Sequence, residues 1–182
     1  MKERINKIPD ILKISLKRNK NFPNNRLPVL IYRSAVNLPK QKNRSSELLQ
    51  KIFLTNNWSN TWKNGIYNFH HYHSNTHECL GISMGSAFLI LGGPGGKRVE
   101  VTAGDILILP AGVGHKCLKA SKKFRCIGAY PEGKDYDTNT GTPAEYKKAI
   151  TKIRTLSIPQ KDPVYGKKGF LKNYWKKTIK KQ

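Results

Sequence analysis

FHHYHSNTHECLG (residues 69–81) and LPAGVGHK (residues 109–116) are the two stretches from which the fold of this chain can be deduced. The chain contains five histidines, of which four lie in the first stretch and the fifth, His115, lies in the second. Gly65 precedes the first stretch and Gly104 precedes the second, and glycine favours the turns at which strands begin and end. Histidines gathered between turns in this way predict a site where several side chains meet.

The spacing of these residues predicts a set of metal ligands. His71 and His73 are two residues apart, so on a β-strand both imidazoles project from the same face. A turn through residues 74–76 would bring Glu78 back on the next strand, and His115 could complete the set from a strand further along the chain. Three neutral imidazoles and a carboxylate suit one divalent ion, and Mn, Fe, Co, Ni and Zn all accept these ligands.

The two stretches resemble the two conserved motifs of the cupin superfamily. The resemblance implies that the metal ligands are His71, His73, Glu78 and His115. Lys119 departs from the family pattern, because the second motif usually closes with an asparagine there, but that position is not a ligand. The blocks at residues 23–32, 62–87, 103–116, 128–133 and 162–169 look like the YjlB-like group of small bacterial cupins. This resemblance implies a fold and a metal site, and it implies no particular substrate.

Short apolar runs between residues 62 and 130 predict an all-β fold. Glycine, proline, asparagine and serine separate these runs, which is typical of antiparallel strands. The runs are GIYNF (65–69), SAFLIL (86–91), RVEV (98–101), DILIL (105–109) and FRCIGAY (124–130). GGPGG at residues 92–96 predicts a hairpin loop, because no helical pattern follows it that would suit a phosphate site. We therefore expect a double-stranded β-helix, that is, a jelly-roll barrel with a few flanking helices.

The chain of 182 residues is long enough for one domain, which we divide into three parts. Residues 1–61 are predicted to form an N-terminal arm with a strand and a short helix that packs on the barrel. Residues 62–137 form the barrel core with both motifs, and residues 138–182 form a C-terminal helix and a basic tail.

Both arms contain a helical pattern. SSELLQKIF (45–53) places Leu48, Leu49, Ile52 and Phe53 on one face, with Ser45 or Ser46 as the expected N-cap. Thr142, Pro143 and Glu145 predict a second helix that begins with a capping box. Its apolar stripe consists of Tyr146, Ala149, Ile150 and Ile153.

The net charge of +23 belongs to the arms. Lys and Arg exceed Asp and Glu by 11 in residues 1–64, by 2 in residues 65–142 and by 10 in residues 143–182. The tail interleaves Tyr174 and Trp175 with lysines, as a single-strand nucleic-acid binder does. However, the lysines are scattered and no nucleic-acid-binding motif is present, so we expect nonspecific attraction to polyanions and no specific nucleic-acid partner.

Five residues near the motifs have open alternatives. Tyr67 and Phe69 share the parity of the first two ligands, so we expect them to face the barrel interior and line the pocket. Cys117 shares a face with the histidine of the second motif and either lines the pocket or fills the core. His77 either contacts a ligand from behind or lies on the surface, and His70 is expected at the surface or an interface.

Composition also bears on location and assembly. Cys79, Cys117 and Cys126 form no CxxC pair, so we expect buried thiols in a reducing compartment. No apolar stretch approaches 18 residues, which predicts no membrane span and a cytoplasmic protein. PNNRLPVLIY (23–32) is an extended apolar segment that could exchange between two copies, so we expect a homodimer.

Three functions remain compatible with the sequence. The first is a metal-dependent enzyme acting on a small oxygenated or carboxylate compound, in the manner of a dioxygenase, decarboxylase or isomerase. The second is a non-catalytic cupin that binds a metal or small ligand, and the third is a polyanion-binding protein. No general acid is evident, because the carboxylates other than Glu78 in the central segment resemble turn or surface residues, so a tyrosine or His77 could serve. Those carboxylates are Glu100, Asp105, Glu132, Asp135 and Asp137.

Overall fold

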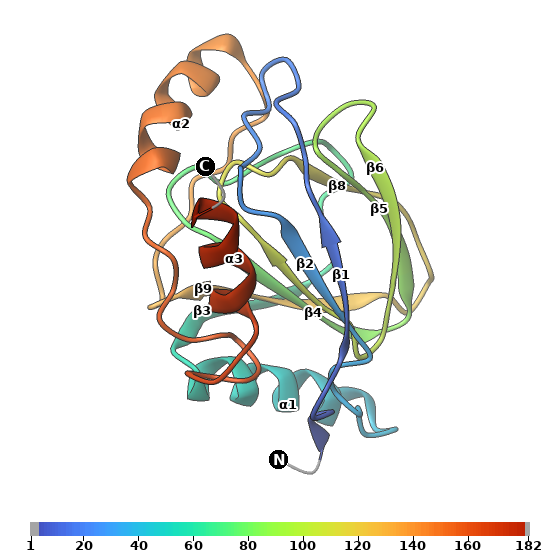
Figure 1. Cartoon of the computed structure of the whole chain (residues 1–182). Helices are drawn as coiled ribbons and strands as arrows, with labels where there is room; N and C mark the ends of the chain where they lie inside the picture. The colour runs from blue at the N-terminus through green and yellow to red at the C-terminus, as the bar shows by residue number, and fades with distance from the viewer. Residues whose placement is uncertain (1–3, 181–182) are drawn as a thin grey trace.

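Two antiparallel sheets face each other in the computed structural model, which describes residues 4–180 except for the side chains of residues 42 and 177–180 (Figure 1). The six-stranded sheet has the order β1-β2-β7-β4-β9-β3, and the three-stranded sheet has the order β6-β5-β8. The strands are β1 (Asp10–Ile14), β2 (Val29–Arg33), β3 (Trp58–Asn64), β4 (Glu78–Met84), β5 (Ser86–Leu91), β6 (Lys97–Thr102), β7 (Ile106–Leu109), β8 (His115–Ala120) and β9 (Arg125–Pro131). The helices are α1 (Lys42–Thr55), α2 (Pro143–Thr155) and α3 (Leu171–Lys180). The predicted all-β jelly-roll fold is confirmed.

The six-stranded sheet is buried on both faces. Alternate residues of β4, such as Leu80 and Ile82, pack against the three-stranded sheet in the main core. Residues of the opposite parity, such as Cys79, pack against a second core to which α1 and α3 contribute Phe53 and Trp175. Burial on two faces explains the uninterrupted apolar runs of β2 and β7, because neither face of these strands needs polar side chains.

Most of the predicted strands form. The runs SAFLIL, RVEV, DILIL and FRCIGAY correspond to β5, β6, β7 and β9, and residues 92–96 form the hairpin loop between β5 and β6. The predicted strand at residues 65–69 is wrong, because the chain leaves the sheet after β3 and crosses the barrel mouth as an irregular segment. This irregular segment pairs with β8 through a hydrogen bond of 2.8 Å from the Cys117 amide to the Tyr67 carbonyl oxygen.

The helix of the C-terminal arm begins as predicted and the helix of the N-terminal arm does not. At α2, the Thr142 side chain accepts a hydrogen bond from the Glu145 amide, and the Glu145 carboxylate accepts from the Thr142 amide, which completes the capping box. At α1, the N-cap is Gln41 and makes no side-chain capping bond. Ser45 and Ser46 are buried inside the helix, where they donate to the Pro39 carbonyl and the Ser83 hydroxyl. Tertiary contacts therefore determine this start.

The last arm packs tightly against the body. Trp175 is fully buried, and its indole nitrogen donates to the carbonyl oxygen of Pro28 over 3.0 Å. A buried ring cannot stack on a base, so Trp175 is not accessible for single-strand binding, whereas Tyr174 is half-buried. The end of the tail, residues 181–182, lies outside the described residues.

The N-terminal arm supplies strands to the larger sheet. β1 and β2 extend it at one side, and the predicted boundary at residue 62 falls inside β3, its other edge strand.

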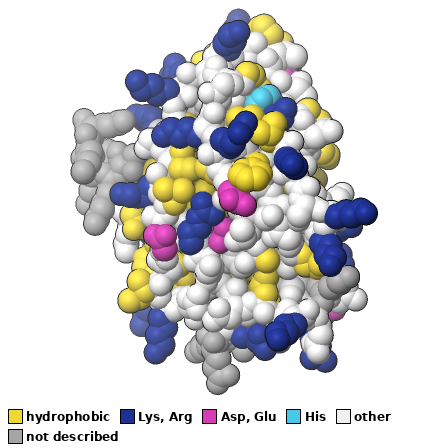
Figure 2. Space-filling view, turned by 90° about the vertical axis from the view of Figure 1, so that its right-hand side faces the viewer, with side chains coloured by type: hydrophobic (Ala, Val, Ile, Leu, Met, Phe, Trp, Pro, Cys, Tyr) yellow, Lys and Arg dark blue, Asp and Glu magenta, His cyan; other side chains and the backbone are white. Residues whose placement is uncertain are grey.

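The three cysteines are free and buried. Among residues 4–180, no helix is long and apolar enough to cross a membrane. Figure 2 shows many Lys and Arg side chains and few acidic ones on the face it presents, in keeping with the net charge of +23.

Candidate metal centre

The two motif stretches are joined by backbone hydrogen bonds at the barrel mouth. The amide of His71 donates to the carbonyl oxygen of His115 over 3.1 Å, and the amide of His115 donates back over 2.8 Å. Two residues further on, the Gly112 amide donates to the carbonyl oxygen of His73. Gly112 has a φ of 85°, a conformation that glycine adopts without strain, and this lets the second motif turn beside the first.

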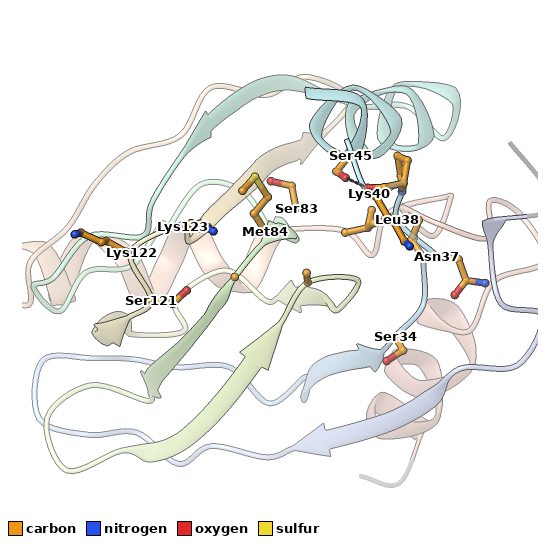
Figure 3. A pocket seen from close by; sticks show the side chains of 14 residues that line it. Ser34, Asn37, Leu38, Lys40, Ser45, Ser83, Met84, Ser121, Lys122 and Lys123 are labelled. Carbon is orange, nitrogen blue, oxygen red and sulfur yellow. Dashed lines mark hydrogen bonds between the residues drawn. The ribbon is translucent and has the colours of Figure 1, made fainter. Parts of the chain in front are cut away.

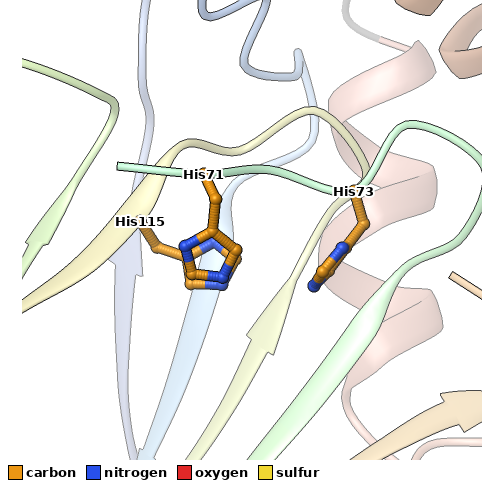
Figure 4. A group of neighbouring side chains, drawn as sticks. All are labelled: His71, His73 and His115. Atoms are coloured by element: carbon orange, nitrogen blue, oxygen red, sulfur yellow. The ribbon is translucent and has the colours of Figure 1, made fainter. Parts of the chain in front are cut away.

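The three imidazoles converge on one buried point. One nitrogen of each of His71, His73 and His115 lies within 4.8 Å of those of the other two, and Figure 4 shows the rings projecting into a common space. Each Nδ1 faces a backbone carbonyl oxygen, at 3.2 Å, 2.5 Å and 3.0 Å respectively. A carbonyl oxygen only accepts, so each Nδ1 carries the hydrogen and each Nε2 offers a lone pair to the shared space.

Glu78, the first residue of β4, adds a carboxylate to this cluster. Its two oxygens lie 3.5 Å from Nε2 of His73 and 3.4 Å from Nε2 of His115. Oε1 accepts a hydrogen bond from the Tyr130 hydroxyl over 2.9 Å, whereas Oε2 is buried and has no hydrogen-bond partner. This buried oxygen faces imidazole lone pairs and no positively charged partner. A divalent cation would fit that set of donors.

Burial and the neighbouring charges set the protonation states of the cluster. Burial, helped by His115, lowers the pKa of His71 to about 3, so this imidazole is neutral. Burial opposes ionisation of Glu78, but His73 and His115 together hold the pKa of its carboxyl below the usual range. Burial likewise opposes protonation of His73, but Glu78 and the Asp137 carbonyl raise its pKa. These shifts favour a positive charge beside Glu78, which a bound cation would also supply.

The cluster forms one wall of a cavity of about 170 Å³. Aromatic side chains form much of the remainder: Trp62, Tyr67, Tyr130 and Tyr136. The indole of Trp62 donates to the Tyr130 hydroxyl over 2.8 Å, and Tyr136 stacks on Tyr130 with ring centroids 4.5 Å apart. Gly128 makes room for this arrangement, because a Cβ atom there would lie 2.1 Å from the Trp62 ring. The cavity is small, aromatic and open to a buried polar cluster.

Asp137 braces the first motif from outside the cavity. Its carbonyl oxygen accepts from His73, and its carboxylate accepts from the amide and hydroxyl of Ser74 at 2.6 Å and 2.5 Å. Lys152 of α2 approaches the same carboxylate to 3.3 Å. The C-terminal arm thus helps to orient one of the four candidate ligands.

Tyr67 and Phe69 lie at the rim rather than in the barrel interior. They are 51% and 42% exposed, and their rings stack with centroids 4.8 Å apart. Tyr67 lines the mouth of the cavity, and Phe69 does not line it. Tyr67 therefore lines the pocket as predicted, whereas the prediction for Phe69 is wrong. This segment is irregular, and alternation holds only along a regular strand.

His77 is neither at the surface nor behind a candidate ligand. It is buried on the opposite side of the chain from Glu78, where its ring lies 4.9 Å from Trp175. Its Nδ1 accepts from the Ala111 amide, and its Nε2 donates to the Ser157 carbonyl. The C-terminal arm covers this side and determines the environment of His77. A local sequence pattern does not reveal that contact.

Cys117 and His70 also have defined places. Cys117 is buried in the main core and does not line the cavity, so the core-filling alternative applies. His70 is half-buried against Phe22, with ring centroids 5.8 Å apart. Its Nδ1 is buried without a hydrogen-bond partner.

Sequence reasoning missed the residues that come from neighbouring strands. The sequence pattern does not single out Tyr130, although strand alternation in FRCIGAY places it on the same face as Cys126, another inward residue. Trp62 carries no motif that could reveal it. Asp105 was expected to be a turn or surface residue. It follows the turn after β6, but it is buried, pairs with Arg33 at 2.7 Å and accepts from two backbone amides.

A larger hollow of about 830 Å³ lies at another part of the surface, where Figure 3 shows Lys40, Lys122 and Lys123 among serines and apolar side chains. No His, Cys, Asp or Glu is among the described residues that line it. It therefore offers none of the usual metal ligands, and the smaller cavity is the candidate site.

Comparison with known proteins agrees with the motifs. No family model matches the chain. Over 150 residues it is 37% identical to the uncharacterized protein YjlB of Bacillus subtilis (strain 168), covering 82% of this chain and 87% of YjlB.

Solved structures show weaker likeness. An acireductone dioxygenase from Bacillus anthracis, with a cadmium ion in its active centre, is 15% identical with a TM-score of 0.36. That match covers 48% of this chain and 60% of the dioxygenase, less than two thirds of its length. A DUF861-family protein from Thermotoga maritima is 19% identical with a TM-score of 0.34, covering 55% of this chain and 96% of that one. The sequence match to YjlB spans most of both proteins, and we conclude that the chain belongs to the YjlB-like group of cupins.

Proposed function

We propose that this protein is a metal-dependent enzyme that acts on a small oxygenated or carboxylate compound. The observation that carries the proposal is the convergence of three Nε2 atoms and the partnerless Glu78 Oε2 at the wall of a cavity. The ligands would be His71, His73, Glu78 and His115. Four acceptors that face one another are costly to bury unless a cation lies between them.

The surrounding side chains would prepare the site for a substrate. Tyr130 holds Glu78, and the Asp137 carbonyl holds His73, so two ligands keep their orientation before a metal binds. The aromatic walls offer flat surfaces to a planar compound. A divalent ion held here would act as a Lewis acid toward a substrate oxygen, and Fe or Mn would also permit oxygen chemistry.

The cavity limits the size of the substrate. Pockets for drug-sized ligands usually measure about 300 to 1,000 Å³. At about 170 Å³, this cavity suits a compound of metabolite size with one or two oxygen atoms directed at the cluster.

Elemental analysis tests the proposal most directly. Inductively coupled plasma mass spectrometry would compare the wild type with His71→Ala/His73→Ala and with His70→Ala, a neighbouring histidine outside the cluster. We expect about one equivalent of metal in the wild type and in His70→Ala, and almost none in the double variant. A wild type that takes up no Mn, Fe, Co, Ni or Zn on reconstitution would overturn the metal site.

A non-catalytic cupin that binds a metal or small ligand is the second candidate, and one observation favours it. Among the described residues, Glu78 is the one carboxylate that lines the cavity, and the Tyr130 hydroxyl is engaged by both Trp62 and Glu78. The described lining therefore offers no second carboxylate for proton transfer, and its other titratable side chains outside the cluster are Lys63, Tyr67 and Tyr136. Saturable binding of small carboxylates without turnover, in metal-loaded protein under aerobic and anaerobic conditions, would favour this candidate.

We also propose a homodimer in the cytoplasm. β2 pairs with β1 and β7 of its own chain, which leaves β1 as an edge strand of the larger sheet. An edge strand can pair with a second copy. A monomer mass by light scattering at micromolar concentration would contradict the dimer.

A further inference from the structure

A second hollow, the arm groove, lies between α2 and the loop that joins β1 to β2. Figure 1 shows this loop rising beside α2. The groove measures about 770 Å³ and is lined by the loop, by the last turns of α2 and by the segment that follows α2. Its floor includes the buried ring of His77, whereas the neighbouring Glu78 lines the metal cavity. The two cavities therefore lie on opposite faces of the same chain segment.

The floor of the arm groove is held by the side-chain amides of buried Asn24 and half-buried Asn25. Asn24 accepts a hydrogen bond from the Gly114 amide over 3.1 Å and donates to the Gly92 carbonyl over 3.2 Å. Asn25 donates to the Ala111 carbonyl over 2.8 Å. A floor fixed in this way is preorganised, so a ligand would not have to order it on binding.

One wall of the groove is aliphatic. Ile150 and Leu156 are half-buried and belong to none of the three hydrophobic core clusters of the described residues. Their apolar surface is directed at the groove instead. Ile153 continues this wall and packs against the small cluster around Phe22 and Tyr72. An aliphatic surface that is neither buried in a core nor scattered singly suits an apolar ligand.

The rim of the groove is basic. Lys17, Arg18, Arg26 and Arg154 line it with exposed side chains, and no Asp or Glu is among its described lining residues. Guanidinium groups match the two oxygens of a carboxylate geometrically. The complementary ligand therefore combines an aliphatic body with a negatively charged head.

We propose that the arm groove binds a single long-chain carboxylate, with its alkyl chain along Ile150, Ile153 and Leu156 and its carboxylate at Arg154 and the basic loop. The combination favours this ligand over a polyanion, which would leave the aliphatic wall exposed, and over an apolar compound, which would not match the exposed cations of Lys17, Arg18 and Arg154. The groove lies within the volume range of about 300 to 1,000 Å³ that is usual for small-ligand sites. The proposal does not depend on the metal centre.

Isothermal titration calorimetry with octanoate, decanoate and dodecanoate, each below its micelle concentration, tests the apolar part. Each buried methylene should tighten binding by roughly fourfold until the chain fills the groove. Dodecyltrimethylammonium, with the same chain and a positive head, should bind more weakly than dodecanoate. Affinity that does not rise with chain length, or an equal affinity for the cationic amphiphile, would overturn the proposal.

Three variants place the ligand in the groove. Ile150→Gln should reduce the gain per methylene, and Arg154→Glu should weaken dodecanoate binding by at least about fivefold. Lys148→Glu makes the same charge change on an exposed residue of α2 that does not line the groove, and should alter binding by less than about twofold. Circular dichroism checks that each variant folds. Equal losses in Arg154→Glu and Lys148→Glu would show attraction to net charge alone and would sink the proposal.

Discussion

Asp162 and Glu78 are two carboxylates buried to the same degree, at 1% and 2% exposed, in different surroundings. Asp162 lies in a turn between α2 and α3, and Glu78 begins β4 at the metal cavity. Asp162 accepts four hydrogen bonds, from the Tyr32 hydroxyl and from the amides of Val164, Tyr165 and Leu171. Glu78 accepts one hydroxyl bond at Oε1, and its Oε2 faces imidazoles without a hydrogen-bond partner.

The difference indicates that Asp162 stabilises the fold, whereas Glu78 is arranged to bind a cation. The chain surrounds Asp162 with donors, although burial still raises the pKa of its carboxyl. Around Glu78 the chain places groups that are themselves acceptors when neutral, and it satisfies the Nδ1 side of each imidazole with a backbone carbonyl. Satisfied acceptors stabilise a fold, whereas converging unsatisfied ones indicate a missing cation.

Removing Asp162 should have the largest effect. Asp162→Ala leaves a buried hydroxyl and three buried amides without an acceptor, so the free energy of unfolding should fall by about 3 to 5 kcal/mol. Urea denaturation followed by circular dichroism measures it. Asp10→Ala, at an exposed carboxylate of β1, should change stability by less than about 0.5 kcal/mol. A loss below about 1 kcal/mol in Asp162→Ala would remove the contrast.

Glu78→Gln should affect metal binding instead of stability. In the metal-free protein, the new amide can donate to Nε2 of His73 or His115, so the free energy of unfolding should change by less than about 1 kcal/mol. Metal affinity, measured by competition with a chelator, should fall on the order of 100-fold or more, because loss of a ligand exceeds loss of its support. A large destabilisation without loss of metal would instead make Glu78 a second structural carboxylate.

Ser74→Ala tests whether the contact between Ser74 and Asp137, which orients His73, contributes to metal binding. The variant removes the 2.5 Å hydrogen bond from the Ser74 hydroxyl to Asp137, whose carbonyl orients His73. Metal affinity should fall by about tenfold while the protein remains folded. Thr138→Ala, an exposed neighbour, should leave the affinity unchanged. Equal affinities in the two variants would show that the brace plays no part.

Two tyrosines offer a matched pair with the smallest effects. Tyr32 donates to Asp162 and Tyr130 donates to Glu78, so each Tyr→Phe change removes one hydroxyl from a buried carboxylate. Tyr32→Phe should lower the free energy of unfolding by about 1 to 2 kcal/mol and leave metal affinity unchanged. Tyr130→Phe should weaken metal binding about fivefold. If both variants behave alike in both assays, the two carboxylates do not differ in role.

His71, His73 and Glu78 could be predicted from sequence because their spacing is local, whereas His115 was indicated by the second motif. The interval between His71 and His73 encodes one face of an extended segment, and it does so even though that segment forms isolated bridges rather than a regular strand. Tyr67 and Phe69 could not be placed in the same way, since the chain before His71 is irregular. Alternation predicts which side chains share a face only where backbone pairing keeps the segment extended.

The sequence by itself determined the jelly-roll fold, the residues that meet at the cluster and the capping box of α2, because each depends on the order of neighbouring residues. The tertiary structure alone decided that Trp62 and Tyr130 meet above the cluster, that Trp175 covers His77 and that Asp162 collects its four donors. These contacts join residues at least 68 positions apart in three cases, Trp62 to Tyr130, His77 to Trp175 and Tyr32 to Asp162. Contacts between residues that are distant in the sequence depend on how the sheets and arms pack, so a local sequence pattern does not predict them.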